Sequence, residues 1–241
     1  ASIARALEEM RQAGVKPAAL LFDTIFSSDG IFSPEAQRVQ QGMAMVRAAG
    51  GLVIADEVQP GFGRTGSQRW GFLRYSVTPD LVSLGKPMGN GHPVAALVGR
   101  PELFAEFGRR QRYFNTFGGN PVSCRAAQAV LQVLRSEQLQ NNAQEVGCFL
   151  RQGLCALAAQ YPLIGDIRGE GLFIGVELVL CREQKTPASQ IAAAVVNKMR
   201  QRQILISTTG PQANILKIRP PLVFRQQHAE LLLQTLAQVL E

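Results

Sequence analysis

Two short apolar runs organise the middle of the chain, and each ends beside a residue with useful chemistry. The runs are Leu52–Ala55 and Leu81–Leu84. Near-continuous apolar runs of this length are typical of parallel strands that are buried on both faces. Asp56 directly follows the first run, and Lys86 follows the second after one glycine. Because ligands bind beyond the carboxyl ends of such strands, the pattern predicts an acid and an amine above one crevice.

Around this stretch the pattern alternates helices with strands. The segment Ser33-Pro34-Glu35 supplies a cap, a first-turn proline and an acid, so it predicts a helix that runs on to Gly50. With the strands on either side it forms a βαβ unit. The other elements expected in this half are helices at Ser2–Ala13 and after Pro101, strands at Ala18–Phe22 and Val94–Val98, and a helical region Val122–Gln160 interrupted near Ser136.

From about Leu163 the pattern changes to short strands mixed with helices. The expected strands are Ile164–Arg168 paired with Leu172–Leu178, then Ile204–Ser207 and Ile215–Ile218; the expected helices are Ser189–Arg202 and Gln227–Leu240. Hairpins of this kind predict a smaller α+β domain.

Composition narrows the class of protein. The chain is 46% hydrophobic and 18% charged, which is enough for a core. It contains no run of about 18 apolar residues, so no membrane-spanning helix is expected. Four cysteines form no C-x-x-C pair and only two histidines accompany them, which argues against a metal site. We expect free thiols and a cytoplasmic location, and we expect Cys148 and Cys155, seven residues apart in one helix, to pack in the core.

The net charge of +7 does not by itself indicate nucleic acid. The basic residues are scattered along the chain rather than interleaved with aromatics. The one cluster, Arg109, Arg110 and Arg112, is interpreted as a solvated helix end, and attraction of an anionic cofactor or substrate is the alternative.

The acid and the amine together fit the needs of one cofactor. Pyridoxal phosphate (PLP) is bound through a lysine, while a carboxylate faces its ring nitrogen and keeps it protonated. Taken singly, Asp56 could cap a helix and Lys86 could be a solvated loop residue. A rival motif, Gly61-x-Gly63-x-x-Gly66, matches the dinucleotide fingerprint, but five residues separate it from the strand and no long helix follows, so that interpretation is rejected.

Three motifs in order, ADEVQPGFGRTG, SLGKPMGNGHPVAA and NTFGGNP, resemble the class III aminotransferase family of PLP enzymes, of fold type I. The resemblance implies that Lys86 is the Schiff-base lysine and that Asp56 is the partner of the ring nitrogen. It further implies that Val58 packs on one ring face and that Gln59 contacts the ring hydroxyl. Thr116 would reach the cofactor phosphate of the partner subunit, which implies a homodimer with shared active sites.

The fold class expected from this resemblance is α/β: part of the large parallel-sheet domain of a fold type I enzyme, followed by a small α+β domain. The expected bounds are 1–122 for the PLP-binding part, 123–162 for connecting helices and 163–241 for the small domain. The family's glycine-rich phosphate loop and stacking aromatic are not found. We therefore expect the chain to be a C-terminal portion that is inactive alone, and a non-catalytic domain of a larger protein is a further alternative.

Two substitutions leave the reaction open. Where many family members carry an arginine that clamps a substrate carboxylate, this chain has Lys217, and where some carry its glutamate partner it has Ser28. An ammonium cannot reproduce the planar two-point clamp of guanidinium. Lys217 and Arg219 would suit a phosphate, and two segments resemble the family's phospho-lyase branch. The substrate is expected to be a small amino compound, undergoing either aminotransferase-type chemistry or loss of phosphate.

Overall fold

The computed structural model describes residues 2–241, and the chain divides into two compact units. The first unit contains the residues up to Thr24 together with Pro34–Phe62 and Trp70–Ser136. The second contains Ile25–Ser33, Gly63–Arg69 and Glu137–Glu241. The expected three-part division at residues 122 and 162 stays a prediction.

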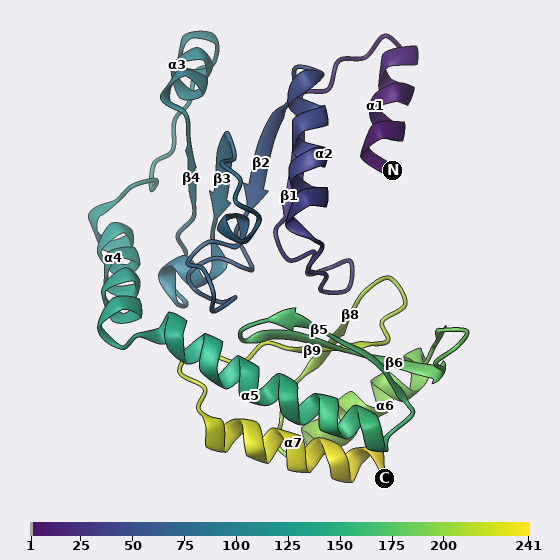
Figure 1. Cartoon of the computed structure of the whole chain (residues 1–241). Helices are drawn as coiled ribbons and strands as arrows, with labels where there is room; N and C mark the ends of the chain where they lie inside the picture. The colour runs from purple at the N-terminus through teal and green to yellow at the C-terminus, as the bar shows by residue number, and fades with distance from the viewer. Residues whose placement is uncertain (1) are drawn as a thin grey trace. The chain divides into compact units, whose positions relative to one another are not determined.

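The first unit is built on a mixed four-stranded sheet with the order β1-β2-β3-β4 (Figure 1). Strands β1 (Ala19–Asp23), β2 (Leu52–Asp56) and β3 (Leu81–Leu84) are parallel, as their continuous apolar character predicts. The fourth strand, β4 (Ala96–Gly99), runs antiparallel to β3. The chain returns to β3 through tight turns, so no crossover helix separates the two strands.

The four α-helices of the first unit agree with the expected positions, except at one start, and the two short helices η1 and η2 were not expected. They are α1 (Ser2–Gln12), α2 (Ala36–Ala48), η1 (Gly71–Tyr75), η2 (Lys86–Gly89), α3 (Pro101–Arg110) and α4 (Pro121–Ser136). The expected cap at Ser33 is wrong: α2 begins at Ala36, and Glu35 in the N-cap position makes no side-chain cap bond. The backbone is still extended at Glu35, with φ −58° and ψ 137°, so the first helical residue is Ala36.

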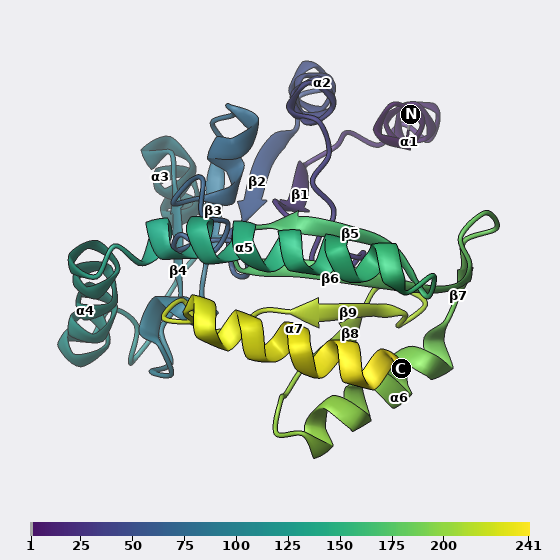
Figure 2. The same ribbon diagram turned by 60° about the horizontal axis from the view of Figure 1, so that its bottom comes forward.

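The second unit contains a five-stranded antiparallel sheet with three helices on one face (Figure 2). Its elements are α5 (Leu139–Gln160), β5 (Ile164–Glu170), β6 (Phe173–Cys181), β7 (Thr186–Pro187), α6 (Ser189–Gln201), β8 (Ser207–Thr209), β9 (Ile215–Ile218) and α7 (Gln226–Leu240). The strand order is β5-β6-β9-β8, and β7 pairs with β6 off this path. The predicted break near Ser136 is confirmed: Gln138 has the left-handed backbone that separates α4 from α5.

The core of the second unit lies between this sheet and α5, α6 and α7. The buried residues that α5 contributes to it are Ala143, Val146, Leu150, Leu154 and Leu157. Cys148 and Cys155 are exposed, so the prediction that they pack in the core is wrong. Residues seven apart do share a helix face, but here that face is the one turned to solvent.

One strand of the second unit is shorter than its sequence predicts. Ile204–Ile206 are apolar, yet pairing with β9 starts only at Ser207, opposite Lys217. The backbone N–H of Ile204 instead donates a hydrogen bond to the carbonyl of Met199, and this bond caps the C-terminal end of α6. None of the helices within residues 2–241 combines the length and the apolarity that a membrane crossing requires.

Candidate active site

Asp56 is the last residue of β2, and its position in the sheet is well defined. It lies opposite Asp23 of β1 and Ser83 of β3. Its Oδ1 accepts hydrogen bonds from the backbone N–H of Val58 at 3.0 Å and from the hydroxyl of Ser83 at 3.1 Å. Among residues 2–241, none donates a hydrogen bond to Oδ2 of Asp56. One carboxylate oxygen therefore fixes the orientation of the group, and the other is available for a ligand.

Lys86 stands beyond the end of the neighbouring strand. β3 ends at Leu84, and Lys86 opens the short helix η2 with an exposed side chain. Its backbone φ is +34°, a value that residues other than glycine rarely adopt. Because β2 and β3 are parallel neighbours, Asp56 and Lys86 belong to the same edge of the sheet.

Val58 links these two strand ends. A Cβ placed on Gly85 would lie 3.6 and 3.8 Å from the two methyl groups of Val58. The Val58 side chain is therefore beside the backbone from which Lys86 projects. Gln59 follows it and is half-buried.

Glu57 is a residue that sequence reasoning passed over, although it stands next to Asp56. Its side chain is fully buried. It accepts hydrogen bonds from the backbone N–H of Gly71 at 2.7 Å, from that of Phe72 at 2.8 Å and from the hydroxyl of Thr24 at 3.0 Å. Desolvation raises the pKa of this carboxyl, and these three donors oppose the rise. Glu57 ties the chain on either side of β2 together, and Asp56 points away from it because successive strand residues alternate.

Thr116 lies on the loop of residues 111–120 between α3 and α4, and its side chain is exposed. The loop is shaped by Asn115, whose Oδ1 accepts from the N–H of Phe117 at 3.2 Å and of Gly118 at 2.9 Å. Asn120 closes it: its Oδ1 accepts from the N–H of Ser123 at 3.0 Å, which caps α4. Figure 1 shows this loop as the long connection leading into α4.

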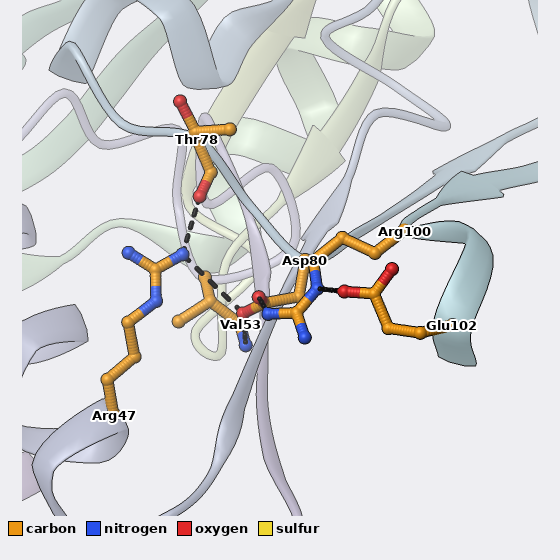
Figure 3. Close-up of polar contacts among 6 residues, drawn as sticks. All are labelled: Arg47, Val53, Thr78, Asp80, Arg100 and Glu102. Carbon is orange, nitrogen blue, oxygen red and sulfur yellow. Dashed lines mark hydrogen bonds and ion pairs between the residues drawn. The ribbon is translucent and has the colours of Figure 1, made fainter. Parts of the chain in front are cut away.

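A buried carboxylate marks the opposite end of the β2–β3 pair. Asp80 accepts the N–H of Val53 at 2.9 Å and the guanidinium of Arg100 at 2.9 Å, and Arg47 lies 3.5 Å away (Figure 3). Arg47 and Arg100 also bond the carbonyl of Thr78 and the carboxylate of Glu102, respectively. This cluster joins the starts of β2 and β3 to α2 and to the start of α3, far along the strands from Asp56.

The glycine motif Gly61-x-Gly63-x-x-Gly66 has a packing role in the structure. A Cβ on Gly66 would lie 2.7 Å from the Cα of Gln144, and a Cβ on Gly171 would lie 2.6 Å from the carbonyl oxygen of Arg64. Arg64 donates to the carbonyls of Leu172 and Pro220. Gly66 thus lets this segment approach the backbone of α5, and Gly171 lets the β5–β6 turn approach the backbone at Arg64.

Lys217 lies in the middle of β9, in the second unit. Register places it opposite Gly175 of β6 and Ser207 of β8, while Arg168 of β5 lies opposite Gly175 on the other side. Residues directly opposite share a face, so these four form one row across the sheet. Lys217 and Arg219 also line a groove of about 700 Å³ whose other walls come from the 203–207 segment and from α7.

Ser28 lies on the segment Ile25–Ser33, which packs on the face that carries this row. Arg168 fixes the segment: its Nε donates to the carbonyl of Gly30 at 2.8 Å, and its guanidinium lies 4.4 Å from the ring centre of Phe32. A Cβ on Gly175, opposite Lys217, would lie 3.2 Å from Cδ1 of Ile31. Ser28 itself is exposed.

Arg64 and Arg219 bring two further positive charges close together in the second unit. Burial lowers the pKa of Arg64 to about 10, and the charge of Arg219 acts in the same direction. The guanidinium of Arg219 lies 5.9 Å from the ring centre of Phe173. The end of β9 is therefore a cationic region, as the sequence of Lys217 and Arg219 indicates.

Comparison with known proteins identifies the family of this chain. The chain matches the family described as aminotransferase class-III over residues 1–240. It is 45% identical over 215 residues to an alanine–glyoxylate aminotransferase 2-like protein of Drosophila melanogaster, covering 88% of this chain and 44% of that protein.

Two solved structures extend the comparison. An Arthrobacter phospholyase, solved in complex with phosphoethanolamine, has a TM-score of 0.95 and 44% identity, covering 99% of this chain and 57% of that one. A PLP-bound amine transaminase from an uncultivated Pseudomonas species has a TM-score of 0.87 and 28% identity, covering 98% and 55%. The chain spans about half the length of the proteins it matches. It belongs to the aminotransferase class-III family, with the fold of the PLP-dependent enzymes of fold type I.

Proposed function

We propose that the protein carrying this chain is a PLP-dependent enzyme that acts on a small amino compound. The observation that carries the proposal is the position of Asp56 and Lys86 at one edge of the sheet, at the carboxyl ends of the parallel neighbours β2 and β3. This is where open α/β sheets bind ligands. The pair also supplies the amine and the carboxylate that PLP needs.

The residues present fit that cofactor. Asp56 is oriented through Oδ1 alone, which suits a carboxylate that holds a protonated ring nitrogen with its other oxygen. Lys86 is exposed at the end of its strand and can reach a ligand. Val58, against Gly85, presents methyl groups beside this edge, which suits one face of an aromatic ring. Gln59 would contact the ring hydroxyl.

When bound, PLP supplies an electron-accepting ring for cleavage of a bond at the amino carbon of the substrate. The residues of this chain have separate tasks. Asp56 would keep the ring nitrogen protonated and hold the ring in place. The Lys86 amine would take a proton from the amino carbon and return it, as a general base and acid. Ser83 would hold the Asp56 carboxylate in its orientation.

The assignment of Thr116 carries a proposal about assembly. We infer that Thr116 completes the phosphate site of a partner subunit in a homodimer. The exposure of its loop supports this, since Phe114 is 86% and Phe117 78% exposed, a large apolar area to leave in water. Sedimentation of the full-length protein tests it: an active PLP-loaded monomer would contradict the proposal.

We propose that the reaction is of the aminotransferase type. The alternative, which is the second candidate, is elimination of phosphate from a phosphorylated amine. Lys217 and Ser28 favour the second, because an ammonium with a neutral partner binds phosphate readily and makes no two-point clamp on a carboxylate. The similarity to a phospholyase solved with phosphoethanolamine points the same way. In that reaction a proton leaves the amino carbon, and its electron pair expels phosphate from the neighbouring carbon.

One paired assay on the full-length protein separates the two reactions. Phosphate release from phosphoethanolamine is measured without any keto acid, and amino transfer from alanine is measured with glyoxylate. Release without an acceptor supports the lyase; rapid transfer with slow or absent release supports the aminotransferase. Lys217→Arg should raise the rate of amino transfer from alanine relative to the rate of phosphate release. Absence of both activities in the wild-type protein would contradict the proposed function.

We also propose a reducing, cytoplasmic location for the protein. The support is the state of its four cysteines, all of which are free thiols, three of them exposed. Cell fractionation tests this directly, and recovery in an oxidising compartment would contradict it.

A further inference from the structure

The loop that carries Lys86 contains little regular secondary structure. Residues 85–95, here called the Lys86 loop, consist of successive tight turns: Met88 N–H to Gly85, Asn90 N–H to Pro87 and His92 N–H to Gly89. Lys86 adopts a positive φ of 34° within it. Sparsely populated backbone conformations persist only when surrounding contacts hold them. A side-chain anchor for this loop is therefore to be expected.

His92 provides that anchor. Its Nε2 lies 2.8 Å from the Oγ of Ser123, on the first turn of α4. The Nδ2 of Asn120 donates to the same Oγ at 2.9 Å and to the carbonyl of Phe117 at 2.8 Å. A continuous chain of hydrogen bonds thus runs from the Lys86 loop, through the start of α4, to the residue that follows Thr116.

The donor pattern is consistent along this chain. The Nδ2 of Asn120 can only donate, so Ser123 Oγ accepts from it and still has its own hydrogen to donate to His92 Nε2. In this arrangement His92 carries its ring hydrogen on Nδ1. Ser123 is 8% exposed, so breaking this bond leaves a nearly buried hydroxyl to find another partner.

A serine beside a histidine also suggests a hydrolytic nucleophile, but the surroundings oppose that interpretation. A nucleophilic serine needs its histidine oriented by a third group, typically a carboxylate. Here the third group, Asn120, donates to the serine oxygen and occupies one of its lone pairs. Ser123 is also nearly buried at the start of a helix. The arrangement suits a structural bridge.

We propose that His92 is a positioning residue that orders the Lys86 loop and the Thr116 loop (residues 111–120) together, acting through Ser123 and Asn120. The proposal rests on the proposed function, since it is the cofactor roles of Lys86 and Thr116 that give the coupling its purpose. Loss of the bridge loosens both loops, although His92 belongs to only one of them.

Hydrogen–deuterium exchange of the full-length protein without PLP tests the coupling. In His92→Ala, the amides of residues 86–94 and of 113–119 should both exchange about fivefold faster, the factor that corresponds to one lost hydrogen bond. Ser123→Ala should do the same. His92→Gln, whose side-chain amide can also accept from Ser123, should keep near wild-type exchange in both loops. His228→Ala, which alters the chain's other histidine in the second unit, is the matched control.

Titration with PLP gives the second readout. His92→Ala should weaken PLP binding about fivefold, and His92→Gln should restore most of it. Faster exchange in residues 86–94 alone would overturn the coupling, as would a His92→Gln variant that behaves like His92→Ala, or unchanged PLP affinity. Failure of wild type to bind PLP would overturn the proposed function instead, because the exchange measurement does not depend on the cofactor.

Discussion

Ser83 and Asp56 lie directly opposite each other on the parallel strands β3 and β2, and the Ser83 hydroxyl donates a 3.1 Å hydrogen bond to Asp56 Oδ1. The strand that leads to Lys86 therefore also orients the carboxylate on its neighbour. In this way the sheet register, and not only the loops above it, fixes the relation between the two groups assigned to the cofactor.

The Ser83–Asp56 bond predicts the effect of Ser83→Ala. Removing a hydrogen bond to a charged group costs about 1.5–3 kcal/mol when the group needs it for orientation. We expect PLP affinity to fall by roughly ten- to a hundredfold, as measured by absorbance titration. Ser207→Ala, at an exposed serine on β8, is the control. Equal affinity of Ser83→Ala and wild type would contradict the orienting role.

Asp80 predicts an acid-dependent loss of stability. Desolvation works to raise its pKa, but the Val53 N–H and the guanidinium groups of Arg47 and Arg100 outweigh it and lower the pKa below the ordinary 3.8. Stability from Asp80 is therefore present above that pH and is lost as pH falls through the folded value. Asp80→Asn should cost about 1–3 kcal/mol near neutral pH and less in acid.

Unfolding midpoints of wild type and Asp80→Asn between neutral and acid pH check this. Glu102→Gln is the matched control, because Glu102 is an exposed partner of the same Arg100 and its replacement should change stability little. A penalty for Asp80→Asn that does not shrink in acid would be inconsistent with the assigned pKa direction.

Glu57 predicts the opposite dependence. Desolvation raises its pKa above the ordinary 4.5, despite bonds from Gly71, Phe72 and Thr24. Its stabilising contribution is fully present below that pH and is lost as pH rises through the folded value. Glu57→Gln places an amide hydrogen against one of the backbone donors, so it should destabilise by about 1–3 kcal/mol, most strongly at acid pH. A penalty that grows with rising pH in the same unfolding series would show the sign to be wrong.

Gly66 predicts a packing cost that can be separated from a conformational one. Its φ is +74°, and a Cβ would lie 2.6 Å from Oε1 and 2.7 Å from the Cα of Gln144. Gly14 has a similar φ of +69° with nothing within 4 Å. Gly14→Ala should cost about 1 kcal/mol, from backbone strain alone, whereas Gly66→Ala should cost well over about 2 kcal/mol because backbone of α5 must move. Denaturant unfolding of both variants compares them, and equal costs would rule out the close packing.

Local pattern predicted the elements of this fold better than their ends and partners. The continuous runs at Leu52 and Leu81 gave parallel strands, because apolar residues on both faces require burial on both faces. The direction of β4 depends on a pairing with β3 that no local pattern encodes. The strand expected at Ile204 starts later because its N–H closes a helix instead.

The residues of the candidate site also fall into two groups, those that local sequence predicts and those that it does not. Asp56 and Lys86 could be predicted because each follows an apolar run, and the motifs around them are specific. Glu57 could not, since its donors Gly71 and Phe72 lie 14 and 15 residues further along the chain. His92 and Ser123 are 31 residues apart and join a loop to a helix. Contacts of this kind depend on the tertiary arrangement, which periodicity does not report.

The central claim is that Lys86 is the lysine that binds PLP. Within this chain the alternatives are its four other lysines, Lys16, Lys185, Lys198 and Lys217. Incubation of the full-length protein with PLP, reduction with borohydride and peptide mapping by mass spectrometry identify the modified residue. The account predicts the label on Lys86, and its loss in Lys86→Ala. A label on any other lysine, or labelling that persists at full extent in Lys86→Ala, would contradict it.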